Sequence, residues 1–173
     1  ASRGFPPSGG TPGADVFAAD ASRVLSALFT EHGVTPSRLH LVAFSLGGYA
    51  ALSAFDVAAK QKQKPASLSL LASIARIAMV RPDFWGRFGT GDVYDVQPLL
   101  AEVPAPVLVV QGGADEAFVG TSQGKQLAAG LGERGRYVER PGVGHTALLD
   151  DDGALAAVRG LIETHATAST NSP

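Results

Sequence analysis

Short apolar segments alternate along this chain with longer segments in which apolar residues recur every three or four positions. Four segments have the length and composition of β-strands, and they cover residues 39–44, 67–73, 107–110 and 136–140. Segments with helical spacing cover residues 15–32, 46–60, 96–102, 121–131 and 150–164. Because strands and helices alternate, the pattern predicts an α/β fold with a mostly parallel sheet covered by helices.

Residues 1–165 are predicted to form a single domain, because the chain of 173 residues is long enough to bury one core. The content of 45% hydrophobic and 17% charged residues is typical of a globular protein. Residues 166–173 are small and polar and are expected to be a disordered tail. A net charge of −2 argues against nucleic acid or an anionic membrane as a partner. The chain has no cysteine, which excludes disulfides, thiolate metal sites and a cysteine nucleophile.

The junction between the apolar run 39–44 and the helical segment after it has the clearest chemical meaning. A strand that passes directly into a helix leaves Ser45 at the apex of a sharp turn. The backbone of such an apex is strained, and the small residues Ala43 and Gly47 on either side of it are expected to avoid collisions. The free N–H groups at the start of the helix point toward the same place and favour an anion there. The turn therefore exposes the Ser45 hydroxyl as a candidate nucleophile.

Residues 43–48, with the sequence AFSLGG, resemble the nucleophile elbow of the α/β-hydrolase family, with Ala43 in place of the usual first glycine. The resemblance implies that Ser45 is the nucleophile and that the backbone N–H of Leu46 is one donor of the oxyanion hole. A parallel strand that meets its crossover helix with a serine in the turn would give the same pattern without any chemistry. A base and an acid elsewhere in the chain decide between these interpretations.

A serine nucleophile needs a base, and the base needs an acid that orients it. His145 lies in a glycine-containing turn just after the fourth predicted strand, although a surface histidine without a catalytic role is the alternative. Asp115 follows the third predicted strand, at the carboxyl end where catalytic groups gather in parallel sheets. Its neighbour Glu116 is the alternative acid. The order Ser45, Asp115, His145 is that of the α/β-hydrolase triad, and both turns are similar to those of the family.

The resemblance implies a serine hydrolase that cleaves small acyl or aryl esters through an acyl-enzyme, without a metal or another cofactor. An apolar lining for the substrate is expected from Phe44, Leu46, Trp85 and Phe118. Residues 74–95 concentrate aromatic residues between Pro and Gly, which is typical of a small lid but also of ordinary core. The same triad would serve thioester hydrolysis, acyl transfer, C–C bond hydrolysis or cofactor-free perhydrolysis. A non-catalytic binding module is the alternative outside the enzymes.

The resemblance also implies an N-terminally truncated fold, since its first strands would precede residue 1. Residues 2–8 look like the loop after the fourth strand of the family, although Ala1 and Pro6 depart from its pattern. The strand 39–44 would then be an open sheet edge, which invites pairing. We therefore expect either a longer hydrolase that covers this edge or pairing with another subunit, as in a homo-oligomer. The chain has no signal-peptide pattern and no apolar run of transmembrane length, which favours the cytoplasm.

Overall fold

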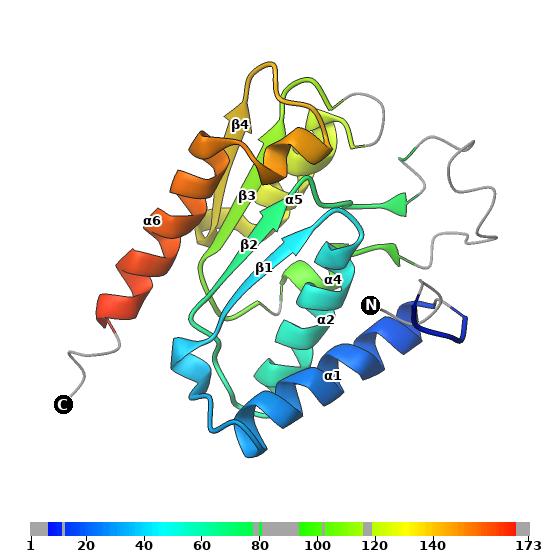
Figure 1. Ribbon diagram of the computed structural model, residues 1–173, viewed down its shortest axis with the longest axis vertical. Helices are drawn as coiled ribbons and strands as arrows, with labels where there is room; N and C mark the ends of the chain where they lie inside the picture. Colours follow the sequence, from blue (N-terminus) through cyan, green and yellow to red (C-terminus); the bar gives the residue numbers. More distant parts are fainter. Residues whose placement is uncertain are drawn as a thin grey trace.

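The described residues form a sheet of four parallel strands. The computed structural model describes residues 7–11, 13–77, 80, 94–101, 103–115 and 119–168. In this part of the chain the strands are β1 (His40–Phe44), β2 (Ser67–Leu71), β3 (Val107–Gly112) and β4 (Gly135–Arg140). They lie side by side in the order β1-β2-β3-β4, and each neighbouring pair is parallel. Because all four run the same way, their carboxyl ends lie at one edge of the sheet (Figure 1).

Helices cover both faces of the sheet (Figure 1). The α-helices are α1 (Ala14–Thr30), α2 (Gly47–Lys60), α4 (Gln97–Leu100), α5 (Thr121–Leu131) and α6 (Asp152–Ala168). The part of the chain that the structure describes also contains the short 3-10 helices η1 (Pro36–Arg38), η4 (Gly132–Arg134) and η5 (Thr146–Leu149). The last helix continues to Ala168, which is three residues into the segment 166–173 that was expected to form a tail. Among the described residues, no helix is long and apolar enough to cross a membrane.

The two central strands send alternate side chains into two separate cores. Leu70 of β2 and Val109 of β3 pack in the core that α2 and α5 cover. Leu108 and Val110 of β3 point the other way and pack in the core that α6 covers. Every residue of β2 and β3 is buried, which is the pattern of parallel strands between two layers of helices. The predicted α/β fold with a parallel sheet is therefore confirmed.

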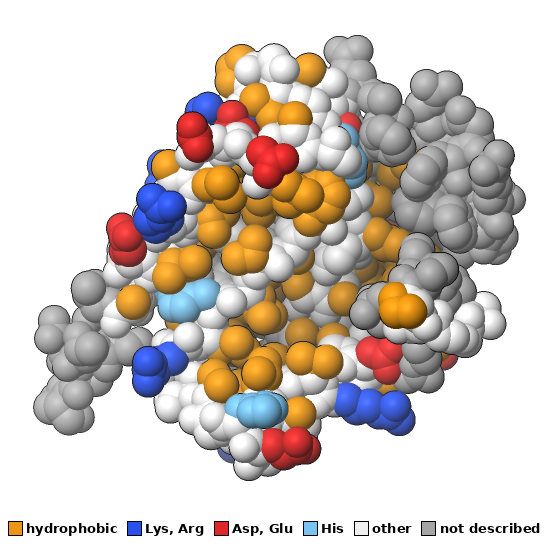
Figure 2. Space-filling model, viewed as in Figure 1, with side chains coloured by type: hydrophobic (Ala, Val, Ile, Leu, Met, Phe, Trp, Pro, Cys, Tyr) orange, Lys and Arg blue, Asp and Glu red, His pale blue; other side chains and the backbone are white. Residues whose placement is uncertain are grey.

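The first strand is less buried than its apolar sequence predicts. Only Ala43 of β1 is buried, and the side chain of Val42 is 54% exposed. The reason is topological, because β1 pairs with β2 on one side and no strand of the described chain lies on its other side. A hollow of about 690 Å³ lies between this strand and α1, with Val24 and Leu28 in its lining. Apolar side chains gather across this face of the molecule (Figure 2).

Candidate active site

Ser45 occupies the sharp turn between β1 and α2. Its φ is 53°, in the left-handed region that residues other than glycine seldom adopt. Its backbone N–H donates to the carbonyl oxygen of Leu71 at the end of β2, with an N···O distance of 2.9 Å. This bond and the helix that begins at Gly47 hold the strained conformation in place. The turn lies at the carboxyl end of β1, where the sequence predicted it.

The tight packing around this turn involves Gly48 rather than Gly47. A methyl group added at Gly47 would meet no described atom within 4 Å. At Gly48 the same group would lie 2.7 Å from the Ser73 hydroxyl oxygen and 2.8 Å from Ser73 Cβ. The described atoms outside its own helix therefore leave room for a methyl group at Gly47, and a collision of larger side chains there stays a prediction. The close approach is one residue later, where α2 passes the segment that follows β2.

Backbone hydrogen bonds join the turn after β3 to the turn after β4. The N–H of Gly113 donates to the carbonyl of Arg140 at 2.8 Å, and the N–H of Ala114 donates to that of Val143 at 3.0 Å. Gly112 is needed for this contact, because a methyl group there would collide with the Val143 carbonyl oxygen. Asp115 leaves the first turn and His145 leaves the second, so these bonds fix the two side chains relative to each other.

Replacing Gly112 by Ala is expected to lower the rate of any reaction that depends on both turns. The added methyl group must push the Val143 backbone away, and a shift of about 1 Å in a catalytic group costs about a hundredfold in rate. The matched control is Gly144→Ala in the same pair of turns, because a methyl group at Gly144 meets no described atom within 4 Å. Steady-state kinetics of both variants check this. Equal activity in Gly112→Ala and Gly144→Ala would show that the junction does not position the site.

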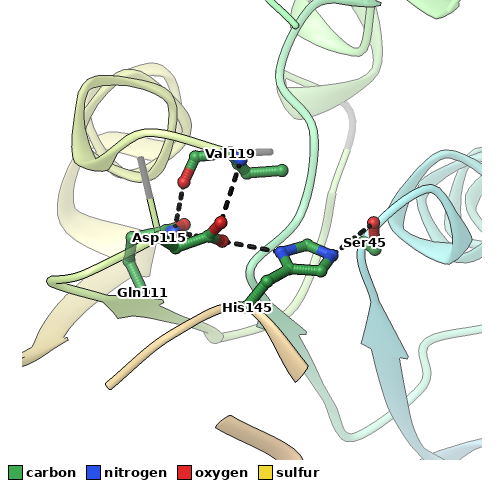
Figure 3. A network of polar contacts seen from close by, with 5 residues as sticks. All are labelled: Ser45, Gln111, Asp115, Val119 and His145. Carbon is green, nitrogen blue, oxygen red and sulfur yellow. Dashed lines mark hydrogen bonds and ion pairs between the residues drawn. The ribbon is translucent and has the colours of Figure 1, made fainter. Parts of the chain in front are cut away.

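Ser45, His145 and Asp115 form a continuous chain of hydrogen bonds (Figure 3). His145 Nε2 lies 3.1 Å from Ser45 Oγ, and His145 Nδ1 lies 2.6 Å from Asp115 Oδ2. A carboxylate only accepts, so Nδ1 donates in this contact, and the Nε2 of a neutral ring can accept from the Ser45 hydroxyl. The ring of Phe44 packs against the imidazole, with the ring centroids 4.7 Å apart. The structure thus brings together the three residues that the sequence placed at separate strand ends.

Asp115 is anchored by two further groups. The residue is 2% exposed, and a carboxylate in such a place is stable only when it is paired and hydrogen-bonded. Its Oδ1 accepts from the backbone N–H of Val119 at 3.2 Å. Its Oδ2, which faces His145, also accepts from the side-chain amide of Gln111 at 3.2 Å. Sequence analysis missed Gln111, because a glutamine at the end of an apolar strand gives no sign of where its amide points.

His40 lies at the wrong end of the sheet to serve Ser45. It begins β1, whereas Ser45 follows the last residue of that strand. Its Nδ1 lies 2.7 Å from the hydroxyl oxygen of Ser67, at the start of β2. Partial burial lowers the pKa of His40, and the nearby His165 lowers it further. These contacts fit a residue that packs the amino-terminal end of the sheet.

Several residues that the sequence singled out lie outside the described part of the chain. They are Glu116, Phe118 and Trp85, together with most of the segment 74–95 that was interpreted as a lid or as core. Leu46 immediately precedes α2, so its backbone N–H lies beside the Ser45 apex. In the described ranges no three His, Asp or Glu side chains lie together as a metal site requires.

Sequence relatives of this chain occur in Mycobacterium tuberculosis. No model of a known protein family matches this sequence. Uncharacterized protein Rv2307c of Mycobacterium tuberculosis is 34% identical over 163 residues, which cover 91% of this chain and 56% of the relative. The corresponding protein of another strain of this species, Uncharacterized protein MT2364, matches equally well. The chain therefore spans little more than half the length of the curated relatives it matches.

Solved structures with a similar fold include esterases and a peptidase. A thermophilic esterase from Thermogutta terrifontis superposes with a TM-score of 0.67 at 19% identity, over 94% of this chain and 78% of the esterase. The esterase RhEst1 from Rhodococcus sp. gives 0.66 at 19% identity, over 90% and 75%. A puromycin-hydrolyzing peptidase of Mycobacterium tuberculosis gives 0.63 at 23% identity, over 84% and 24%. At these identities the likeness establishes the fold. The chain thus has the α/β-hydrolase fold.

Proposed function

We propose that this chain is a serine hydrolase that cleaves small acyl or aryl esters through an acyl-enzyme. The observation that carries the proposal is the hydrogen-bonded chain from Ser45 through His145 to Asp115. A serine hydroxyl is a poor nucleophile at neutral pH unless a base takes its proton, and His145 Nε2 lies within reach of that proton. The esterases among the structures of the same fold agree with this function.

In the first half of the reaction, Ser45 Oγ attacks the carbonyl carbon of the ester while its proton passes to His145 Nε2. The electron pair of the carbonyl double bond moves to the oxygen, which becomes an oxyanion. When this intermediate collapses, the bond to the leaving group breaks. The leaving oxygen takes the proton that Nε2 had received from Ser45 and departs as the alcohol. Asp115 stays ionised throughout and stabilises the positive imidazolium ring through its contact with Nδ1.

In the second half, water attacks the acyl group that is now bound to Ser45. His145 accepts the proton of this water and returns it to Ser45 Oγ as the bond between serine and acyl group breaks. The acid is released and the free serine is restored. The ring of Phe44 beside the imidazole forms one apolar wall of the site, and Trp85 and Phe118 are proposed as further lining.

The oxyanion is proposed to bind at the start of α2. The N–H groups in the first turn of a helix have no intrahelical partner, and the helix dipole adds positive potential there. The Leu46 N–H lies at this end and is the proposed donor. Removing one such donor from a serine hydrolase costs about 3–4 kcal/mol in the transition state. A second donor is not assigned in the described residues.

Hydrolysis of p-nitrophenyl acetate and butyrate by the folded chain tests the proposed function. An acyl-enzyme predicts a rapid first release of one equivalent of p-nitrophenol, followed by a slower steady rate. Thioesters of the same acyl groups, and transfer to added alcohols, separate the ester reaction from the other reactions that the triad supports. A folded chain that releases no p-nitrophenol above the buffer rate would support a non-catalytic binding module instead.

We also propose that the isolated chain pairs with a second copy along the open edge of β1. The edge residues of His40–Phe44 include no Lys, Arg, Asp, Glu or Pro, which are the residues that normally prevent strand pairing. A net charge of −2 is too small to keep two copies apart. Pairing about a two-fold axis would join the two strands in antiparallel fashion. In a longer protein, a strand of that protein would cover the same edge.

Light scattering over a range of concentrations measures this pairing. The isolated chain is expected to have the mass of a dimer, and Val42→Lys is expected to return it to a monomer because it places a charge on the exposed edge. Leu149→Lys is the matched control, since Leu149 is also an exposed apolar residue but lies in η5, away from β1. A wild-type chain that stays monomeric at every concentration would contradict the proposal.

A further inference from the structure

Gln111 is buried among hydrophobic side chains yet points its amide at the candidate acid. It belongs to β3, and its residue is 0% exposed. Its Nε2 donates to Asp115 Oδ2 at 3.2 Å and to the backbone carbonyl of Val119 at 2.6 Å (Figure 3). One side chain therefore contacts both Asp115 and Val119.

The orientation of this amide follows from its partners. Both neighbours of Nε2 are acceptors, so the end of the side chain that faces them must be the NH₂ group. The other end, Oε1, is buried and has no hydrogen-bond partner among the described residues. Leaving an acceptor unpaired in the core is unfavourable, so the two hydrogen bonds that Nε2 donates must compensate for this cost. The contribution of this side chain to the site therefore comes from the NH₂ end of the amide, which faces Asp115 and Val119.

The Gln111 amide acts on the carboxylate oxygen that contacts the base. Asp115 Oδ2 accepts from Gln111 and from His145 Nδ1, while Oδ1 accepts from the Val119 N–H. With donors on both oxygens, the carboxylate cannot rotate about its terminal bond without losing a hydrogen bond. Rotation would move Oδ2 away from Nδ1 and would release the imidazole from the orientation in which Nε2 meets Ser45.

We propose that Gln111 is a positioning residue that fixes the plane of the Asp115 carboxylate and, through it, the His145 ring. The inference rests on the proposed function in so far as the ring serves as a base. Gln111 does not touch the substrate or the reacting atoms. It keeps the hydrogen bond between Asp115 and His145 formed, so that the His145 ring is already oriented toward Ser45 when the substrate binds.

Gln123 provides a matched control in the same core. It is 1% exposed and lies on α5. Its side-chain oxygen accepts from the backbone N–H groups of Ala75 at 2.9 Å and Arg76 at 3.2 Å, away from Asp115. Replacing either glutamine by Met removes a buried amide and keeps the volume. Only the Gln111→Met change removes a donor from the candidate acid.

The experiment measures kcat and KM for an aryl ester together with the NMR resonance of the hydrogen-bonded Nδ1 proton of His145. Gln111→Met is expected to lower kcat by up to about a hundredfold with little change in KM, and to shift or broaden the resonance. Gln123→Met is expected to leave both unchanged, whatever it does to thermal stability. If the Met variants behave alike in kcat and in the resonance, the positioning role is overturned.

Two further outcomes remain decisive. If the wild type has no esterase activity, the proposed function fails, but the Nδ1 resonance of the two variants still tests the positioning role by itself. If Gln111→Met does not fold, Gly124→Ala replaces it, because a methyl group at Gly124 would lie 3.1 Å from Gln111 Cβ and 3.2 Å from its Oε1, and 2.9 Å from the Tyr137 ring. That methyl group is expected to displace the Gln111 side chain and disturb the same resonance. An unchanged resonance in Gly124→Ala with a displaced Gln111 overturns the proposal.

Discussion

Asp115→Asn is expected to lower kcat for an aryl ester by about ten-thousandfold, the size of effect known for loss of the triad acid in serine proteases. The first reason is charge, because an amide cannot stabilise the imidazolium that forms during acylation. The second reason is geometry. The carboxylate of Asp115 meets the N–H of Val119 on one oxygen and both Gln111 and His145 on the other. In one orientation the NH₂ group of the asparagine would face the Val119 N–H, which is itself a donor. In the other orientation it would face the Gln111 amide and His145 Nδ1. Nδ1 would then have to accept, so the proton of a neutral ring would lie on Nε2, which could no longer take the proton of Ser45.

Steady-state kinetics of the folded variant measure this effect, with Asp150→Asn as the control. Asp150 is an exposed carboxylate at the end of η5, so the control makes the same chemical change without touching the hydrogen-bonded chain. The control is expected to retain wild-type activity. If Asp115→Asn keeps activity close to that of the control, another carboxylate serves as the acid, and the neighbouring Glu116 becomes the first candidate.

Ser45→Ala is expected to have the largest effect, a loss of about a millionfold in kcat. In the proposed mechanism, the substitution removes the oxygen that forms the acyl bond, and no change elsewhere would restore that bond. Alanine has the same backbone freedom as serine at a φ of 53°, so the turn itself should keep its conformation. The loss of activity is therefore expected without a comparable loss of stability.

Ser73→Ala is the control for the serine substitution. Its hydroxyl lies beside Gly48 of α2, but the residue is 1% exposed and is not hydrogen-bonded to His145 in the structure. The control is expected to hydrolyse the ester at the wild-type rate, while thermal unfolding shows that both variants are folded. A Ser45→Ala variant that keeps a substantial part of the activity would point to a different nucleophile.

The positions of the three candidate residues could be predicted because each depends on a local rule. Ser45 sits where an apolar strand passes directly into a helix, and Asp115 and His145 each follow a strand in a turn that contains glycine. Parallel strands bring their carboxyl ends to one edge, so residues distant in the sequence meet there. The pattern of strands and helices carries that information without any knowledge of side-chain contacts.

The features that could not be predicted depend on contacts between elements. Whether Gly47 or Gly48 is crowded depends on how close α2 comes to Ser73, and the hydrophobic pattern does not encode that distance. The role proposed for Gln111 depends on its contacts with Asp115 and Val119, which the strand pattern does not encode. The exposure of Val42 follows from the position of β1 at the edge of the described sheet, whereas its apolar sequence resembles that of the buried strands.

Mass spectrometry of the wild-type chain after reaction with a fluorophosphonate probe shows whether Ser45 is an activated nucleophile. The probe forms a stable bond only with a serine that a neighbouring base activates, so it reads the nucleophile without any assumption about the natural substrate. A single adduct is expected on Ser45. It is expected to be absent from Ser45→Ala and from a wild-type chain that was unfolded before labelling. An adduct on another residue, or none on the folded wild-type chain, would contradict this prediction.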